Sequence, residues 1–171
     1  MAMFATTAEL EDFADTSLTF TRAILAIELA SSACESAAKS SNATIEQVVG
    51  DERTIDGSGT PVVTLPAWPV TAVTAITIGD DPVTDFSWSL NGVLERTSGV
   101  WPKGRRNISV TFTHGFADVP SEIKLVALQV AARIVGNPQG LTQFGSDGVS
   151  GSFSPNLLND REHATVLRAL R

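Results

Sequence analysis

The 171-residue sequence is poor in the residues from which disulfides, zinc sites and membrane spans are built. Its single cysteine, Cys34, can form no disulfide within the chain, and one cysteine with two histidines argues against a structural zinc site. Cys34 lies in a helical pattern among Ala and Ser, which is typical of a small buried side chain rather than of a reactive thiol. No apolar run reaches the roughly 18 residues that a spanning helix needs, so we expect no membrane partner.

The sequence also lacks the motifs that would indicate an enzyme. His114 follows a predicted strand, but no GxSxG nucleophile motif accompanies it. Gly57-Ser58-Gly59 lacks the lysine of a phosphate-binding loop. Asp80, Asp81 and Asp85 lack the ligand spacing of an EF-hand and are typical of a polar turn. We therefore predict no catalytic residue, no cofactor and no metal site.

Basic residues are few and are unevenly placed along the chain. Twelve Lys and Arg stand against nineteen Asp and Glu, for a net charge of −7. The first sixty residues hold ten acids and three bases, and the rest of the chain is balanced. The one basic cluster, Lys103, Arg105 and Arg106, is small enough to be simply solvated. Binding to the phosphate backbone of a nucleic acid needs clustered Lys and Arg side chains, so the sequence does not predict nucleic-acid binding.

Two helices are predicted near the N-terminus. Thr6 and Glu9 have the spacing of a capping box and predict a helix over 6–15. A longer helix is predicted over 17–40, and its second half is rich in Ala and Ser. Small side chains permit close approach of a neighbouring backbone, either of the same subunit, which we favour, or of another. The apolar residues of this helix lie three or four apart: Phe20, Ile24, Ile27, Ala30, Cys34 and Ala37.

Short runs of β-type residues predict strands between 44 and 114. Gly50-Asp51 is a turn signal between runs at 44–49 and 53–55. Asn91-Gly92 predicts a hairpin that joins a strand beginning at Phe86 to its return strand.

A strand and a helix meet at a short corner in the second half of the chain. Ile108, Val110 and Phe112 alternate with polar residues, which predicts a strand with one buried face. His114-Gly115 ends this strand, and Pro120 is suited to the first turn of a helix over 120–136. We therefore predict an α+β fold: a helical bundle of the N-terminal helices and the central helix, with a small antiparallel β-sheet and hairpin.

The last part of the chain is predicted to be an extended arm. The domain is expected to span 1–139, and residues 140–171 to form a tether and a terminal helix. The stretch from Gly140 to Pro155 is too polar and Gly-rich to order itself alone, and is expected to be a tether or a weak hairpin. Asn159 can cap the terminal helix, and a short helix without a partner is marginal in water. We expect that partner to be another chain.

Three motifs resemble one protein family. They are Leu65-Pro66-Ala67-Trp68-Pro69-Val70, the stretch from Val110 to Pro120 with its His114-Gly115-Phe116 corner, and Asn137 to Leu141. Together with the order of elements they resemble the head–tail connector adaptors of long-tailed bacteriophages, especially those that infect actinobacteria. The terminal Arg161-Glu162 departs from the usual order of residues in that family.

The resemblance implies a structural virion protein at the head–tail junction. Such adaptors form a ring, commonly of twelve subunits, beneath the portal protein. The ring extends the DNA channel and docks the next neck protein, and genomic DNA passes through without specific binding. A neck stopper or tail-completion protein of the same junction is the alternative, although such proteins are usually richer in β-structure. A small enzyme is a weaker alternative, because the sequence holds no catalytic triad and no set of metal ligands.

Three groups of residues are predicted to carry these contacts. Glu28 and Glu35, seven residues apart on one helix face, are predicted to line the channel. The predicted contacts with a neighbour or the next neck protein are Phe86, Trp88, Trp101 and Arg105. The predicted portal contacts are Leu157, Leu158, Arg161, Val166, Leu167, Arg168, Leu170 and Arg171.

Overall fold

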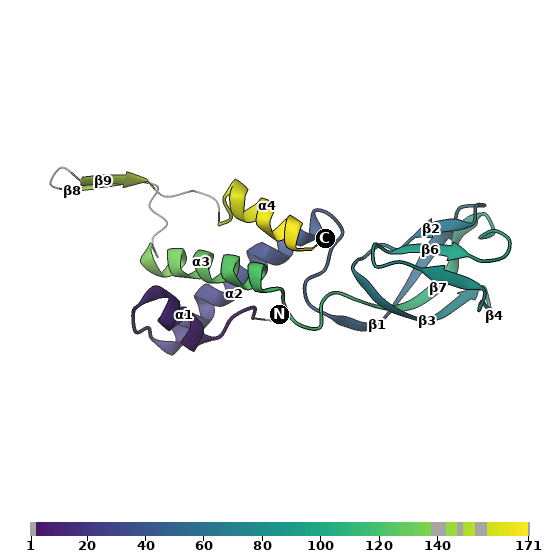
Figure 1. Ribbon diagram of the computed structural model, residues 1–171, viewed down its shortest axis with the longest axis horizontal. Coiled ribbons are helices and arrows are strands. Elements are labelled where there is room, and N and C mark those ends of the chain that lie inside the picture. Colours follow the sequence, from purple (N-terminus) through teal and green to yellow (C-terminus); the bar gives the residue numbers. More distant parts are fainter. Residues whose placement is uncertain (1–2, 138–142, 147–148, 153–156, 171) are drawn as a thin grey trace. The chain divides into compact units, whose positions relative to one another are not determined.

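The computed structural model describes residues 3–137, 143–146, 149–152 and 157–170 (Figure 1). The fold is α+β, as predicted. The chain divides into two compact units, one formed by Met1–Ser41 with Val119–Arg171 and the other by Asn42–Asp118. We call them the helical unit and the β unit. This division differs from the predicted one, because the strands form a unit of their own and the terminal helix belongs to the helical unit.

The helical unit contains four helices, and local capping signals predict two of their starts. Capping boxes are present at Thr6 with Glu9 and at Asn159 with Glu162, as their three-residue spacing indicates. The second helix begins at Phe20, later than predicted, with Thr19 as its N-cap residue. The helices are α1 (Thr7–Ala14), α2 (Phe20–Lys39), α3 (Ser121–Gly136) and α4 (Asp160–Ala169).

The core of the helical unit is made largely of small and branched aliphatic side chains. The Ala-rich half of α2 is buried within its own unit, as favoured above, and Phe4 donates its backbone N–H to buried Ser31 Oγ at 3.1 Å. Phe20 departs from the predicted stripe and is 70% exposed. Helical side chains tilt toward the N-terminus of their helix. Phe20 is the first residue of α2, so its side chain extends beyond the end of the helix. The buried residues of α2 and α3 are Ala23, Ala26, Ile27, Ala30, Ser31, Cys34, Ala37, Ala38, Ile123, Val126, Ala127, Val130 and Ala131.

The β unit consists of two small antiparallel sheets. One has the strand order β1-β7-β3-β4 and the other β2-β6-β5. A separate hairpin pairs β8 (Gln143–Ser146) with β9 (Val149–Ser152), within the stretch predicted to be a tether or weak hairpin; 138–142, 147–148 and 153–156 lie outside the described residues. The strands of the β unit are β1 (Val48–Gly57), β2 (Val62–Thr64), β3 (Val70–Ile78), β4 (Asp81–Pro82), β5 (Phe86–Trp88), β6 (Val93–Arg96) and β7 (Gly104–His114).

Strand β7 lies at the centre of the larger sheet and confirms the predicted alternation. Ile108, Val110 and Phe112 have no exposed surface, and β1 and β3 pair with the two edges of the strand. The hairpin at Asn91-Gly92 is also confirmed, because β5 and β6 pair across it.

Gly50-Asp51 is a bulge within β1 and not the predicted turn. Val48 pairs with His114 and Asp51 with Phe112, so β1 carries one extra residue opposite β7. Gly50 has φ +66°, which suits an irregular position in a strand. The long partner strand β7 keeps both halves of β1 in one ladder, and this partner is far away in the sequence.

The corner after β7 requires glycine. Gly115 has φ +85°, and its N–H donates to the Pro69 carbonyl at 2.9 Å. A Cβ atom at this position would lie 2.2 Å from the Glu46 carbonyl oxygen, which is far inside van der Waals contact. The close approach of two backbones therefore excludes any side chain here.

Replacing Gly115 with alanine is expected to destabilise the β unit more than a matched replacement does. Gly99 has nearly the same φ, +83°, but no heavy atom within 4 Å of its Cβ position. Gly99→Ala should cost about 1–2 kcal/mol of backbone strain. Gly115→Ala should cost at least about 1 kcal/mol more because of the clash with Glu46. Urea denaturation measures both, and equal losses would contradict the close approach.

Candidate interaction surfaces

The structure does not assemble a metal or membrane site from the residues that it describes. No group of three or more His, Cys, Asp or Glu side chains could hold a metal ion in that part of the chain. None of the described helices is long and apolar enough to cross a membrane.

His114 has a structural explanation. Its Nε2 lies 3.0 Å from Asp51 Oδ2, and its ring lies 5.1 Å from that of Phe112. Burial raises the pKa of Asp51, but hydrogen bonds from Arg53 and His114 outweigh it and leave that pKa below its usual value. The contact joins the bulge of β1 to the end of β7. It gives a structural partner to one of the two ring nitrogens of buried His114.

Cys34 is a buried core residue, as predicted. Its side chain has no exposed surface. Burial raises the pKa of its thiol to about 12, and the charges of Glu162 and Glu35 add to this effect. The thiolate that nucleophilic chemistry needs is therefore scarce at neutral pH.

Helix α4 packs on its own subunit, whereas the sequence led us to expect its partner on another chain. It contacts both α2 and α3, and Val166 and Leu170 are 0% and 3% exposed. These two residues are therefore not accessible to a portal protein in this conformation. A helix this short is marginal alone, but the apolar surface of α2 and α3 supplies the partner that it needs.

An ion pair holds α4 on α3. Two nitrogens of the Arg133 guanidinium each donate to one oxygen of Glu162, both at 2.9 Å. The same guanidinium donates to the Leu157 carbonyl, so it ties down the segment before α4 as well. The Glu162 side chain is 8% exposed and that of Arg133 27%. A planar guanidinium suits this bidentate geometry.

The remaining predicted portal contacts are partly accessible. Leu157, Arg161 and Arg168 are exposed, and Leu158 and Leu167 are half-buried. Arg171 lies outside the described residues. Portal binding through the accessible residues stays a prediction.

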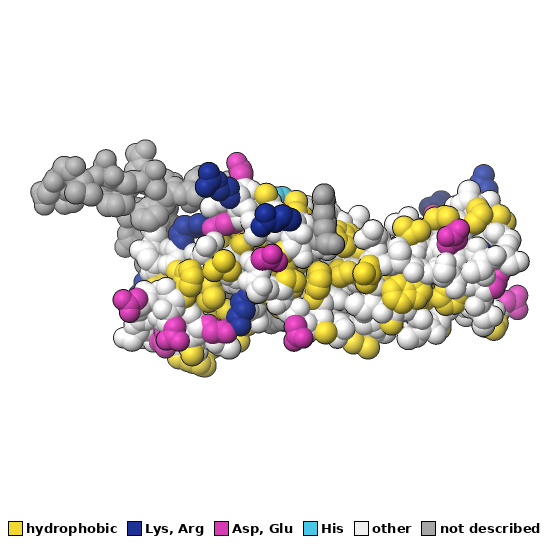
Figure 2. Space-filling model, in the orientation of Figure 1, with side chains coloured by type: hydrophobic (Ala, Val, Ile, Leu, Met, Phe, Trp, Pro, Cys, Tyr) yellow, Lys and Arg dark blue, Asp and Glu magenta, His cyan; other side chains and the backbone are white. Residues whose placement is uncertain are grey.

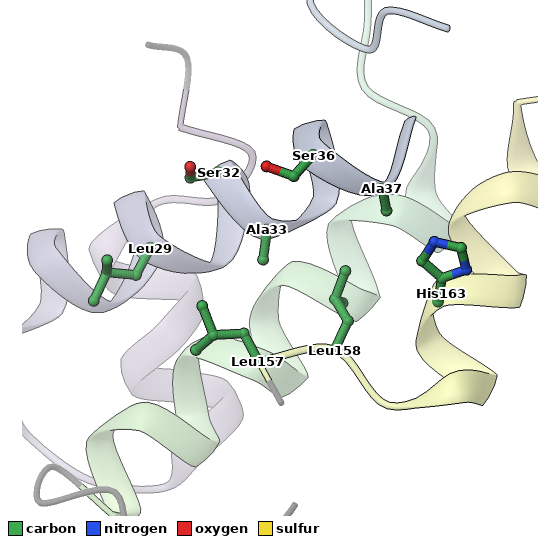
Figure 3. A pocket seen from close by; sticks show the side chains of 8 residues that line it. All are labelled: Leu29, Ser32, Ala33, Ser36, Ala37, Leu157, Leu158 and His163. Carbon is green, nitrogen blue, oxygen red and sulfur yellow. The ribbon is translucent and has the colours of Figure 1, made fainter. Parts of the chain in front are cut away.

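Two open grooves border α4 within the helical unit. The α3–α4 groove has a volume of about 340 Å³, and Figure 2 shows Lys and Arg side chains over α4. The α2–α4 groove has a volume of about 440 Å³, and Leu157 and Leu158 point toward α2 in it (Figure 3). The α3–α4 groove is lined by Glu122, Leu125, Val126, Gln129, Asn159, Arg161, Glu162, Thr165 and Arg168. The α2–α4 groove is lined by Leu29, Ser32, Ala33, Ser36, Ala37, Leu157, Leu158 and His163.

The predicted channel residues differ in exposure. Glu28 is exposed, whereas Glu35 is half-buried. Glu28 stands beside Leu25 and Leu29, which are 55% and 41% exposed. No contact in the structure tests a position on a channel wall.

The predicted neighbour contacts in the β unit are only partly at the surface. Trp88 and Arg105 are exposed and Phe86 is half-buried, so they stay candidates. Trp101 is fully buried in the core of the β unit, with the Arg96 guanidinium 5.3 Å from its ring centre. It therefore cannot reach a neighbour in this structure. The prediction rested on the enrichment of Trp at interfaces, but this ring packs in the core with residues of both sheets.

The fold of the chain matches chains from gene transfer agent particles. A chain from the neck of an empty gene transfer agent particle computed with C6 symmetry aligns over 99% of this chain and 92% of its own, with TM-score 0.59 and 16% identity. A chain from the neck of the native particle computed with C12 symmetry aligns over 99% and 91%, with TM-score 0.57 and 16% identity. A chain from the virion of the native particle aligns over 98% and 89%, with TM-score 0.61 and 15% identity.

This chain has the fold of gene transfer agent neck chains. No protein-family model and no curated protein matches it. At 15–16% identity the likeness concerns the fold, and it extends over 98–99% of the chain.

Removing the carboxylate that holds α4 should destabilise the helical unit. Glu162→Ala leaves Arg133 without its bidentate partner, removes the capping contact to the Asn159 N–H, and is expected to lower the free energy of unfolding by about 2–3 kcal/mol. Asp160→Asn, on the exposed side of the same first turn, should cost about 0.5 kcal/mol or less. Thermal and urea denaturation measure both variants. Equal effects would mean that the ion pair contributes nothing.

Truncating Trp101 should unfold the β unit more readily than truncating Trp88. Trp101→Ala removes a fully buried ring and is expected to cost about 3–5 kcal/mol. Trp88 is 37% exposed, and Trp88→Ala should cost about 1 kcal/mol or less. Urea denaturation followed by fluorescence of the remaining tryptophans measures the difference, and a stable Trp101→Ala variant would contradict the buried position.

Proposed function

We propose that this protein is a structural, non-enzymatic component of the neck of a phage-like particle. The observation that carries the proposal is the match of its fold, over 99% of the chain, to a chain from a gene transfer agent neck. The match extends over 92% of that chain, so both units and their order along the chain are shared. A match limited to one common element of structure, such as a helical bundle, would give the proposal much less support.

Within the neck, we assign the chain to the adaptor position, as a ring of twelve copies beneath the portal. The matching necks were computed with C6 and C12 symmetry, which suits a ring of this kind. The sequence motifs at Leu65–Val70 and Val110–Pro120 support the adaptor in particular. The four helices of this chain also favour it over a neck stopper, which is usually richer in β-structure.

The charge of the chain suits a channel through which DNA passes. The net charge is −7, and the first sixty residues carry most of the excess of acids. An acidic surface repels phosphates, so DNA can move along it without being held. The proposed partners are the portal protein, neighbouring copies and the next neck protein.

Deleting the gene for this chain should give DNA-filled heads that carry the portal and no tail. Supplying the protein to these heads should restore tail joining, and cryo-electron microscopy of the restored particles should place it directly on the portal. Tailed particles in normal numbers without the protein would overturn the neck assignment. Tailless heads that still carry a ring on the portal would overturn the adaptor position and assign the chain to the stopper.

A further inference from the structure

The outer face of α2 carries apolar side chains that its own subunit does not cover. Leu25 and Leu29 lie one turn apart and are 55% and 41% exposed, while the opposite face of α2 is buried in the helical unit. Exposed Glu28 stands beside them and forms no ion pair or hydrogen bond with another described residue. We call Leu25, Glu28 and Leu29 the α2 ridge. An apolar ridge with one free acid is typical of a surface that a partner covers.

The α3–α4 groove has the complementary character. Leu125, 47% exposed, and Val126 give it an apolar floor. Arg161 and Arg168 line its α4 wall; both are exposed, and neither side chain pairs with another described residue. Glu122 lies on the α3 wall, and Glu162, the other acid of the lining, is paired with Arg133. The unpaired cations Arg161 and Arg168 therefore both lie on the α4 side.

The ridge and this groove lie on different sides of α4. His163 lines the α2–α4 groove, which the ridge borders through Leu29. Arg161 and Arg168 line the other groove, and at 100° per residue they stand about 140–160° around α4 from His163. One subunit therefore presents an acidic apolar ridge on one side and a basic apolar groove on the other.

We propose that copies of this chain associate head to tail, with the α2 ridge of one copy seated in the α3–α4 groove of the next. Leu25 and Leu29 cover Leu125, and Glu28 pairs with Arg161 or Arg168. The inference rests on the proposed function, for which it names the interface between copies in the ring. A contact between two different patches propagates, and it closes into a ring when the rotation per subunit allows.

Charge decides between this arrangement and a symmetric dimer. Because the ridge and the groove lie on different sides of the unit, a two-fold contact would place ridge against ridge or groove against groove. The first would bring Glu28 to Glu28, and the second would bring the two arginine-bearing α4 walls together with only Glu122 of each copy as an unpaired acid. Like charges at such a contact are costly, whereas the head-to-tail contact pairs opposite charges. Glu28 then lies between copies and not on the channel wall, and the two arginines face a neighbour instead of the portal.

Cross-linking between introduced cysteines tests the contact. Native Cys34 is fully buried and does not compete for the reagent. A chain carrying both Glu28→Cys and Arg161→Cys, treated with a short bis-maleimide, should form a ladder of dimers, trimers and larger species. A mixture of the two single variants should stop at dimers. Asp12→Cys, at an exposed acid of α1, combined with Arg161→Cys is the matched control and should remain monomeric.

Charge exchange gives a second, independent readout. Glu28→Lys alone, or Arg161→Glu with Arg168→Glu, should weaken self-association in sedimentation by about tenfold, and all three changes together should restore it to within about threefold. Glu122→Lys, on the other wall of the groove, should not weaken it.

Three outcomes would overturn the proposal. The first is that the double-cysteine chain gives no cross-linked ladder, either purified or in particles that carry it. The others are cross-linked dimers from Glu28→Cys alone, and a combined charge variant whose self-association is not restored. If the chain is found in the neck but the ladder is absent, the interface is wrong and the proposed function stands. If the ladder forms but the chain is absent from the neck, the association is real and the proposed function is wrong.

Discussion

The ion pair between Arg133 and Glu162 is the interaction on which the surfaces of the helical unit depend. It joins α3 to α4 and, through the Leu157 carbonyl, also holds the segment that precedes α4. Both grooves exist only while α4 lies on α2 and α3, because α4 forms one wall of each. Removing two charges from water costs free energy, and only good geometry between them offsets that cost. The bidentate contact is therefore formed at one position of α4 on α3.

The β unit depends in a similar way on one strand. β7 pairs with β1 and β3, and its inward residues form the middle of the core together with Trp101. The corner at Gly115 follows directly, where the chain passes against the backbone of Glu46. Side chains of ordinary size could not replace glycine there without moving one of the two backbones.

The proposed function is a role based on shape and surface. Three chains that match this fold do so at 15–16% identity, so the arrangement of elements is retained while most side chains differ. A fold can host many functions, and for that reason the proposed function rests on the extent of the match and on the particles from which the matching chains come. In the proposed ring, the exposed α2 ridge and the α3–α4 groove would form the contact between neighbouring copies.

The sequence by itself determined the features that depend on neighbours within a few residues. The capping boxes at Thr6 and Asn159, the alternation along β7 and the hairpin at Asn91-Gly92 all follow from spacings of two to four residues, and the structure confirms each. The α+β class followed from the same local periods.

Only the tertiary structure decided which surfaces remain exposed. Burial of Trp101 depends on two sheets closing around it, and the bulge at Gly50 depends on β7, more than sixty residues away. The partner of Glu162 lies 29 residues earlier in the chain, so nothing near α4 in the sequence indicated that it would pack on its own subunit. Such contacts form between segments that are distant in the sequence. Local propensity and residue spacing do not indicate which distant segments pack against each other.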